Sequence, residues 1–129
     1  MGTVLNGVRI KKDAAECFLE LCREVFPNEN IMLIRGKIKD GVATVTEFLI
    51  PPFSTYGEGF SGFSSFHIPF DLSLVGVAHS HPSGNTTPSN EDMNYFYGRL
   101  MLIAGYPYDE PSIAAYNSKG EKLAISIID

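Results

Sequence analysis

The sequence predicts a mixed α/β fold in which one partly antiparallel sheet carries a few packed helices. Short apolar runs typical of strands alternate with helical patterns, and Gly-containing turns separate neighbouring runs as they do in hairpins. No internal repeat or run of charges interrupts this order. With 129 residues, 44% of them hydrophobic and 19% charged, the chain fits one globular domain spanning residues 1–129.

Two hairpins are expected in the first 50 residues. Asn6-Gly7 lies between two apolar runs rich in β-branched residues, which is a strong short-range hairpin signal. The runs 30–38 and 42–50 flank Asp40-Gly41 and predict a second, longer hairpin.

A helix is expected between these hairpins, over residues 13–26. Its apolar side chains recur at spacings of three and four residues. Asp13 is placed to cap the helix with Glu16 in the capping-box position, and Pro27 stops it.

The second half of the chain predicts buried strands around a loop and a short helix. Residues 53–66 are rich in Gly, Ser and aromatic side chains and predict a long functional or mobile loop. The apolar run 72–81 predicts a buried central strand that ends at Pro82. A short helix follows from Ser89 to a stop at Gly98; then come a buried strand over 100–108 and a hairpin turning at 118–120.

Composition excludes several functional classes. The net charge of −5 disfavours nucleic-acid binding, which depends on clustered Lys and Arg. The sequence shows neither an apolar window of membrane-spanning length nor the order of a signal peptide, so we expect no membrane partner and a cytoplasmic location. Cys17 and Cys22 do not share a helix face well, which favours reduced thiols in or near the core over a metal site or a disulfide.

The stretch AHSHPSGNTTPSNEDM, residues 78–93, has the pattern of a metal site. His79 and His81 project to the same side of a strand while Ser80 faces the other way. A helix starting at Ser89 can return Asp92 to the strand end as a third ligand. Two imidazoles and a carboxylate leave an open position on a tetrahedral zinc ion, as in catalytic sites. Ser-x-x-Asp is also a helix cap, and the two interpretations can coexist.

The run HSHPSGNTTPSNED resembles the JAMM motif of the MPN+ metalloproteases. FPNENIMLI is similar to the setting of that family's upstream glutamate, which implies Glu29, and residues from Val8 onward resemble small archaeal stand-alone members. Residues 1–7 and 54–65 fit less well. The resemblance implies a cytidine-deaminase-like MPN fold: a curved mixed sheet flanked by helices.

Other acidic residues compete with Glu29 for the role of general base. Glu47 alternates with threonines on an expected solvent face, Glu58 lies in the long loop, and Glu91 should point away from the site. Without the resemblance, the choice among these carboxylates stays open.

The resemblance implies a reaction as well as a site. Zn²⁺ held by His79, His81 and Asp92 activates a water for attack on an amide carbonyl. Glu29 accepts the water proton and passes it to the leaving amine, and the Ser89 hydroxyl stabilises the oxyanion.

The implied substrates are isopeptide bonds, or linear extensions, at the C-terminus of ubiquitin-like β-grasp modifiers or sulfur carriers. Their extended tail can add to a sheet edge, with the 53–66 loop as a second wall or, alternatively, as a homodimer contact. A RadC-type MPN+ protein is disfavoured by the acidic balance, and a non-catalytic MPN scaffold by the intact ligand set. An amidohydrolase barrel is excluded because it needs roughly 200 residues or more.

Overall fold

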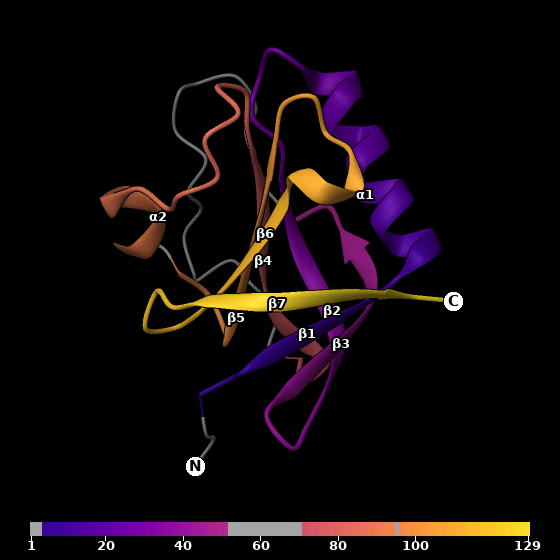
Figure 1. Cartoon of the computed structure of the whole chain (residues 1–129), viewed down its shortest axis with the longest axis vertical. Helices are drawn as coiled ribbons and strands as arrows, with labels where there is room; N and C mark the ends of the chain where they lie inside the picture. The colour runs from indigo at the N-terminus through magenta and orange to yellow at the C-terminus, as the bar shows by residue number, and fades with distance from the viewer. Residues whose placement is uncertain (1–3, 52–70, 95) are drawn as a thin grey trace.

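A computed structural model describes residues 4–51, 71–94 and 96–129. In these ranges one mixed sheet has the strand order β1-β3-β2-β4-β5-β6-β7 and closes into a barrel, because β1 also pairs with β7 (Figure 1). The strands span Gly7–Lys11, Ile31–Lys39, Val42–Leu49, Leu74–His81, Leu100–Gly105, Ile113–Asn117 and Lys122–Ile128. The expected curved mixed sheet is confirmed, but it is closed, which the sequence did not indicate. The cytidine-deaminase-like detail stays a prediction.

The hairpin expected at Asn6-Gly7 is wrong. Val4 to Asn6 lie outside any strand, and β1 begins at Gly7 and pairs in parallel with both β3 and β7. The Asn6 backbone N–H instead donates to the Gly41 carbonyl at 2.8 Å, so Asn6 supports the turn of a different hairpin. Long-range pairing explains Val8 and Ile10 after Gly7, whereas Leu5 lies outside the strand and is buried in the core.

The two remaining hairpins are confirmed. β2 and β3 pair antiparallel around Asp40 and Gly41, whose φ angles of 53° and 79° are in the left-handed region that such a turn requires. β6 and β7 pair antiparallel around a turn that includes Gly120, with φ 81°.

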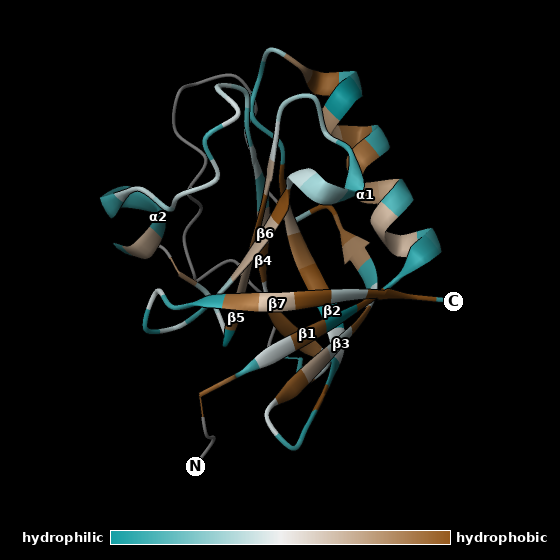
Figure 2. Ribbon diagram, in the orientation of Figure 1, coloured by the Kyte–Doolittle hydropathy of each residue, from teal (hydrophilic) through white to brown (hydrophobic). Residues whose placement is uncertain are grey.

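Helix α1, Lys12–Val25, covers one side of the sheet (Figure 1). The helix is confirmed, but its cap is not: the N-cap is Lys11, without a side-chain cap, and Asp13 Oδ1 accepts from the Ala14 N–H inside the first turn. β1 runs directly into the helix, which leaves no position for a capping box. Figure 2 shows the hydrophobic face of α1 toward the strands, where Phe18 stacks on Phe48 with ring centroids 4.6 Å apart.

Strands β4 and β5 form the parallel centre of the sheet. Every residue of β5 is buried, and so is every residue of β4 except His81, which is half-buried. The pairing His81 with Gly105 aligns the ends of the two strands. Helix α2, Asn90–Asn94, follows this end and stops four residues before the expected Gly98; a short 3-10 helix, Glu110–Ser112, precedes β6.

Both cysteines are free thiols, as expected, and Cys22 is buried; Cys17 is exposed on α1, so the expectation that it lies in or near the core is wrong. Within the described ranges, no helix has the length and apolar character needed to cross a bilayer. The long loop expected over 53–66 lies outside the described residues.

Candidate metal centre

His79, His81 and Asp92 come together at the end of β4. Strand alternation puts both imidazoles on one side, and α2 brings Asp92 back over them. The potential ligand atoms lie within 4.8 Å of one another. All three side chains are 14% exposed or less. The predicted ligand set is therefore assembled within one small volume.

His79 carries the clearest sign of a missing partner. Its Nδ1 atom is buried, has no hydrogen-bond partner among the described residues, and lies 3.7 Å from Asp92 Oδ1. Burial lowers the pKa of His79 to about 4, so the ring is neutral near pH 7. A buried neutral imidazole with an unpaired nitrogen is the form that binds a metal ion.

His81 is oriented by the loop that follows it. Its Nδ1–H donates to the Asn85 carbonyl at 2.7 Å, and its Nε2 atom lies 3.1 Å from Asp92 Oδ2. Burial alone would lower the pKa of His81, but the hydrogen bonds to Asp92 and Asn85 raise it overall. A backbone carbonyl on one ring nitrogen fixes the other as the ligand atom, an arrangement typical of metal-binding histidines.

Asp92 belongs to a reciprocal helix cap. Ser89 Oγ accepts the Asp92 N–H at 3.0 Å, while the Ser89 N–H donates to Asp92 Oδ2 at 2.8 Å. Partial burial opposes ionisation, but the hydrogen bond from His81 and the neighbouring donors hold the pKa of Asp92 at about 2. The helix cap and the carboxylate facing the histidines are thus one structure, as the sequence allowed.

A pocket of about 260 Å³ opens beside these side chains. Glu29 and Ser89 both line it, so the structure brings the predicted base and oxyanion donor to the predicted ligands. Glu91 lines the same pocket and is exposed, and the expectation that its side chain points away from the site stays a prediction. Glu47 is exposed on β3 and pairs with Arg35, and Glu58 is outside the described residues.

The donor set fits zinc. Two imidazole nitrogens and one carboxylate oxygen match the ligands of catalytic zinc sites, which bind at about 2.0–2.2 Å. The 4.8 Å spread of the ligand atoms exceeds the spacing around one ion by roughly 1–1.5 Å, which small side-chain rotations can close. The unpaired His79 nitrogen would gain the partner it lacks.

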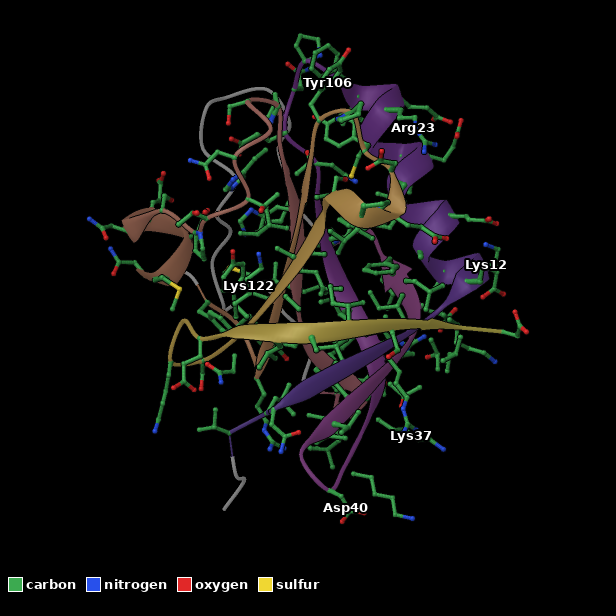
Figure 3. All side chains as sticks on the ribbon, viewed as in Figure 1. Lys12, Arg23, Lys37, Asp40, Tyr106 and Lys122 are labelled. Atoms are coloured by element: carbon green, nitrogen blue, oxygen red, sulfur yellow. The ribbon has the colours of Figure 1, made fainter. Side chains whose placement is uncertain are left out.

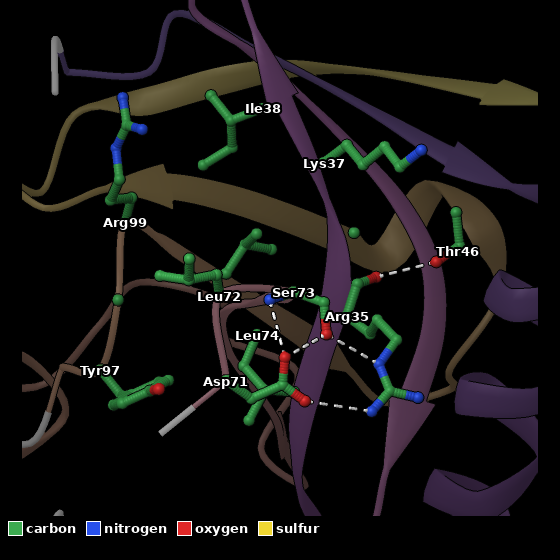
Figure 4. A pocket seen from close by; sticks show the side chains of 13 residues that line it. Arg35, Lys37, Ile38, Thr46, Asp71, Leu72, Ser73, Leu74, Tyr97 and Arg99 are labelled. Atoms are coloured by element: carbon green, nitrogen blue, oxygen red, sulfur yellow. Dashed lines mark hydrogen bonds and ion pairs between the residues drawn. The ribbon is translucent and has the colours of Figure 1, made fainter. Parts of the chain in front are cut away.

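A larger groove, of about 820 Å³, lies at the start of β4, away from the histidines. Figure 4 shows the Arg35 guanidinium facing both Ser73 and Asp71, with the Arg35 Nε atom 3.1 Å from Ser73 Oγ and a guanidinium nitrogen 3.5 Å from Asp71. Lys37, which also lines it, lies far from Tyr106, the residue just beyond β5 at the metal end (Figure 3). Arg35 and Asp71 are already paired with each other, so the smaller pocket is the better candidate for catalysis.

Two contacts of the site could not be found by sequence reasoning. The Asn85 contact uses a backbone carbonyl, which any residue could supply, so its side chain carried no signal. Ser80 was expected only to face away from the site; its hydroxyl in fact accepts the Asn30 N–H at 2.8 Å, next to Glu29. A hydroxyl between two histidines was the only hint in the sequence.

Known proteins match nearly the whole chain. A probable metalloprotease from Haloferax volcanii is 33% identical over 130 residues, covering 95% of this chain and 80% of that protein. A JAB1/MPN domain protein from Archaeoglobus fulgidus has a TM-score of 0.69 and 30% identity, covering 94% of this chain and 99% of the other.

A structure described as JAMM, a metalloprotease-like zinc site in the proteasome and signalosome, has a TM-score of 0.67 and 27% identity, covering 98% and 100% of the two chains. The family described as prokaryotic homologues of the JAB domain matches residues 11–119, which include β4, α2 and all five residues of the predicted site. The chain belongs to this family of prokaryotic JAB-domain homologues.

Proposed function

We propose that this protein is a zinc-dependent protease with its active site at the end of β4. The observation that carries the proposal is the buried His79–His81–Asp92 cluster, in which a His79 nitrogen has no partner among the described residues. The names of the Haloferax relative and of the JAMM structure, a metalloprotease and a metalloprotease-like zinc site, support the same activity. Zinc bound there would lower the pKa of a water ligand toward ~7 and polarise a substrate carbonyl.

The chain's own residues divide the remaining work. Glu29, which is half-buried at the pocket wall, accepts the proton of the attacking water and delivers it to the leaving amine. Ser89 uses its oxygen to cap α2, and its hydroxyl hydrogen is directed to the developing oxyanion. His81 is held by the Asn85 carbonyl so that it does not rotate during turnover.

We further propose that the substrate is a ubiquitin-like β-grasp protein or sulfur carrier with an extended Gly-Gly tail. The support is the motif resemblance together with the size of the pocket, about 260 Å³, which suits a chain without bulky side chains. Cleavage would fall on an isopeptide bond or on a linear extension after the tail. A cytoplasmic location, no nucleic-acid partner and a possible homodimer remain predictions from the sequence.

The test uses two versions of one β-grasp substrate, with the Gly-Gly tail joined to a lysine side chain or to a linear peptide. Zinc-loaded protein should cleave at least one of them, a chelator should stop cleavage, and added zinc should restore it. Glu29→Gln should retain zinc, measured by metal analysis, yet lose nearly all activity because the amide cannot accept a proton.

Three results would count against the proposal. Cleavage that continues with chelator would remove the metal mechanism, and full activity of Glu29→Gln would remove the base. A zinc-loaded protein that binds the β-grasp substrate but cleaves neither version would favour the non-catalytic scaffold.

A further inference from the structure

The residue after Glu29 is held by the strand that carries the histidines. Asn30 is 2% exposed and Ser80 is 0% exposed, so this contact lies in the interior. The Asn30 N–H donates to Ser80 Oγ at 2.8 Å, and the Ser80 N–H donates to the Asn30 carbonyl at 3.0 Å. Two hydrogen bonds thus join the residue beside the predicted base to the residue between two predicted ligands.

This pair departs from a regular antiparallel ladder. In a regular pair that exchanges two hydrogen bonds, both acceptors are backbone carbonyls. Ile31 and His79 pair in the ladder between β2 and β4, but at the next position the Asn30 amide binds a side-chain hydroxyl. Since Ser80 projects opposite to the histidines, its hydroxyl holds the Asn30 amide, just before β2, from the face of β4 away from them. A side chain, rather than the ladder alone, sets where β2 begins.

A second contact ties Asn30 to α1. The Asn30 Nδ2 atom lies 3.7 Å from Cys22 Sγ, and Cys22 is fully buried on the inner face of the helix. By contrast, residues 26–28 before Glu29 are exposed. On one side of Glu29, Asn30 is therefore anchored; on the other side, the chain forms an exposed turn.

Glu29 depends on this anchor because the described residues give its carboxylate no hydrogen bond of their own. Its side chain is half-buried and lines the pocket with His81 and Asp92. The position of the Glu29 carboxylate is then set by the Glu29 backbone, which is held in place through its neighbour Asn30. A general base must lie within hydrogen-bond reach of the water it deprotonates, and a displacement of about 1 Å can cost roughly 10²-fold in rate.

We propose that Ser80 is a positioning residue that sets the place of the Glu29 carboxylate over the predicted ligands, acting through Asn30. The inference rests on the proposed function of Glu29 as the base. It assigns the residue between the histidines a task separate from metal binding. Strand β4 then carries two predicted ligands, His79 and His81, on one face, and it positions the predicted base through Ser80 on its other face.

The decisive variant is Ser80→Ala, which removes the hydroxyl and leaves the Asn30 N–H without its acceptor. With zinc bound and the β-grasp substrate described above, we expect kcat to fall by about 10- to 100-fold. KM and the zinc affinity, measured by competition with a chelator, should stay within about threefold. Ser80→Thr, which keeps the hydroxyl, should recover most of the lost kcat.

Two further measurements separate positioning from general stability. Amide hydrogen exchange at Asn30 should be slow in the parent protein and much faster in Ser80→Ala under conditions where the protein stays folded. Val45→Ala removes buried methyl groups from the main core and serves as a control for lost stability. Assayed well below its unfolding temperature, Val45→Ala should keep the parent kcat.

A double variant checks that Ser80 acts through Glu29. In a Glu29→Gln background, Ser80→Ala should reduce the residual rate no further, because the group being positioned is already gone. An additive loss, an unchanged kcat in Ser80→Ala, or unchanged exchange at Asn30 would overturn the inference. If Glu29→Gln itself retains full activity, the proposed base fails instead, whatever Ser80→Ala does.

Discussion

The cap that Ser89 forms and the oxyanion contact proposed for it use different parts of its hydroxyl. The oxygen accepts the Asp92 N–H at 3.0 Å and so begins α2, while the side chain also lines the pocket beside Glu29. An oxygen that accepts in the cap can still donate its hydrogen to a substrate oxyanion. Stability and turnover can therefore be separated by choice of substitution.

We predict that Ser89→Ala and Ser89→Gly lower turnover by the same factor, on the order of 10²–10³, since both remove the donor. Their stabilities should differ, because Ala at an N-cap costs about 0.5–2 kcal/mol and Gly only a few tenths. Steady-state rates and urea unfolding of the two variants measure the two effects. Turnover that follows stability, with Gly nearly as active as Ser, would leave Ser89 with the cap alone.

At the level of single residues, local sequence patterns were enough to bring the predicted ligands together, but they did not reveal the contacts around them. His79, His81 and Asp92 lie within 14 positions, so strand alternation and one helix turn were enough to place them together. Glu29 is fifty positions from His79, and only the resemblance selected it among several carboxylates. Glu91 follows Asn90 in a five-residue helix and also lines the pocket, a placement that depends on how the preceding loop enters the helix.

Among the elements, the pairing of β4 with β5 depends on Gly76, a position of β4 that has no room for a side chain. A Cβ atom on Gly76 would collide with the Leu100 carbonyl oxygen of the adjacent strand. Gly7, at the start of β1, has only the Val42 Cγ2 atom nearby, at 3.8 Å from an added Cβ. Both glycines lie in strands, and neither has a positive φ, so backbone strain does not distinguish them.

We predict that Gly76→Ala lowers the free energy of unfolding by about 3 kcal/mol or more, since rigid backbone must move at the centre of the sheet. Gly7→Ala should be neutral or stabilise by up to roughly 1 kcal/mol, because it reduces the freedom of the unfolded chain. Urea midpoints at equal slope give both values. Equal midpoints for the two variants would mean that β4 and β5 can separate without cost.

Local elements could be read from the sequence, and non-local pairing could not. The turns at Asp40-Gly41 and Gly120 carry their own signals, and both hairpins formed as expected. β1 was assigned to a hairpin because Asn6-Gly7 carries the same local signal, whereas its partners, β3 and β7, are distant in the chain. Parallel pairing leaves no turn at the strand ends by which to recognise it.

For the molecule as a whole, the predicted ligands join two elements that a polar loop connects along the chain. His79 and His81 belong to β4, Asp92 belongs to α2, and the residues between them make a polar loop. An ion held by all three side chains would cross-link the two ends of this loop in the folded state, but not in the unfolded chain. Metal binding should therefore appear in global stability.

We predict that the unfolding temperature rises with the concentration of free zinc. The free energy of unfolding should increase by about 2.7 kcal/mol when free zinc is at 100 times its dissociation constant. Asp92→Asn should need far more zinc for the same shift, because the ligand charge is lost. Glu29→Gln should respond like the parent protein. Thermal unfolding across a zinc series measures this, and a loss of response in Glu29→Gln would make Glu29 a ligand rather than a base.

The closure of the sheet also bears on the order in which the chain folds. The hairpins β2–β3 and β6–β7 need only local contacts, whereas the β1–β7 seam joins strands from opposite ends of the described chain. Joining distant segments has the larger entropic cost and is slow. β1 also pairs with β3 and runs directly into α1, whose Phe18 stacks on Phe48 of β3, so the helix can dock, with Cys22 beneath Asn30, before the seam closes. The support behind Glu29 therefore does not depend on the slowest step, the closure of the barrel.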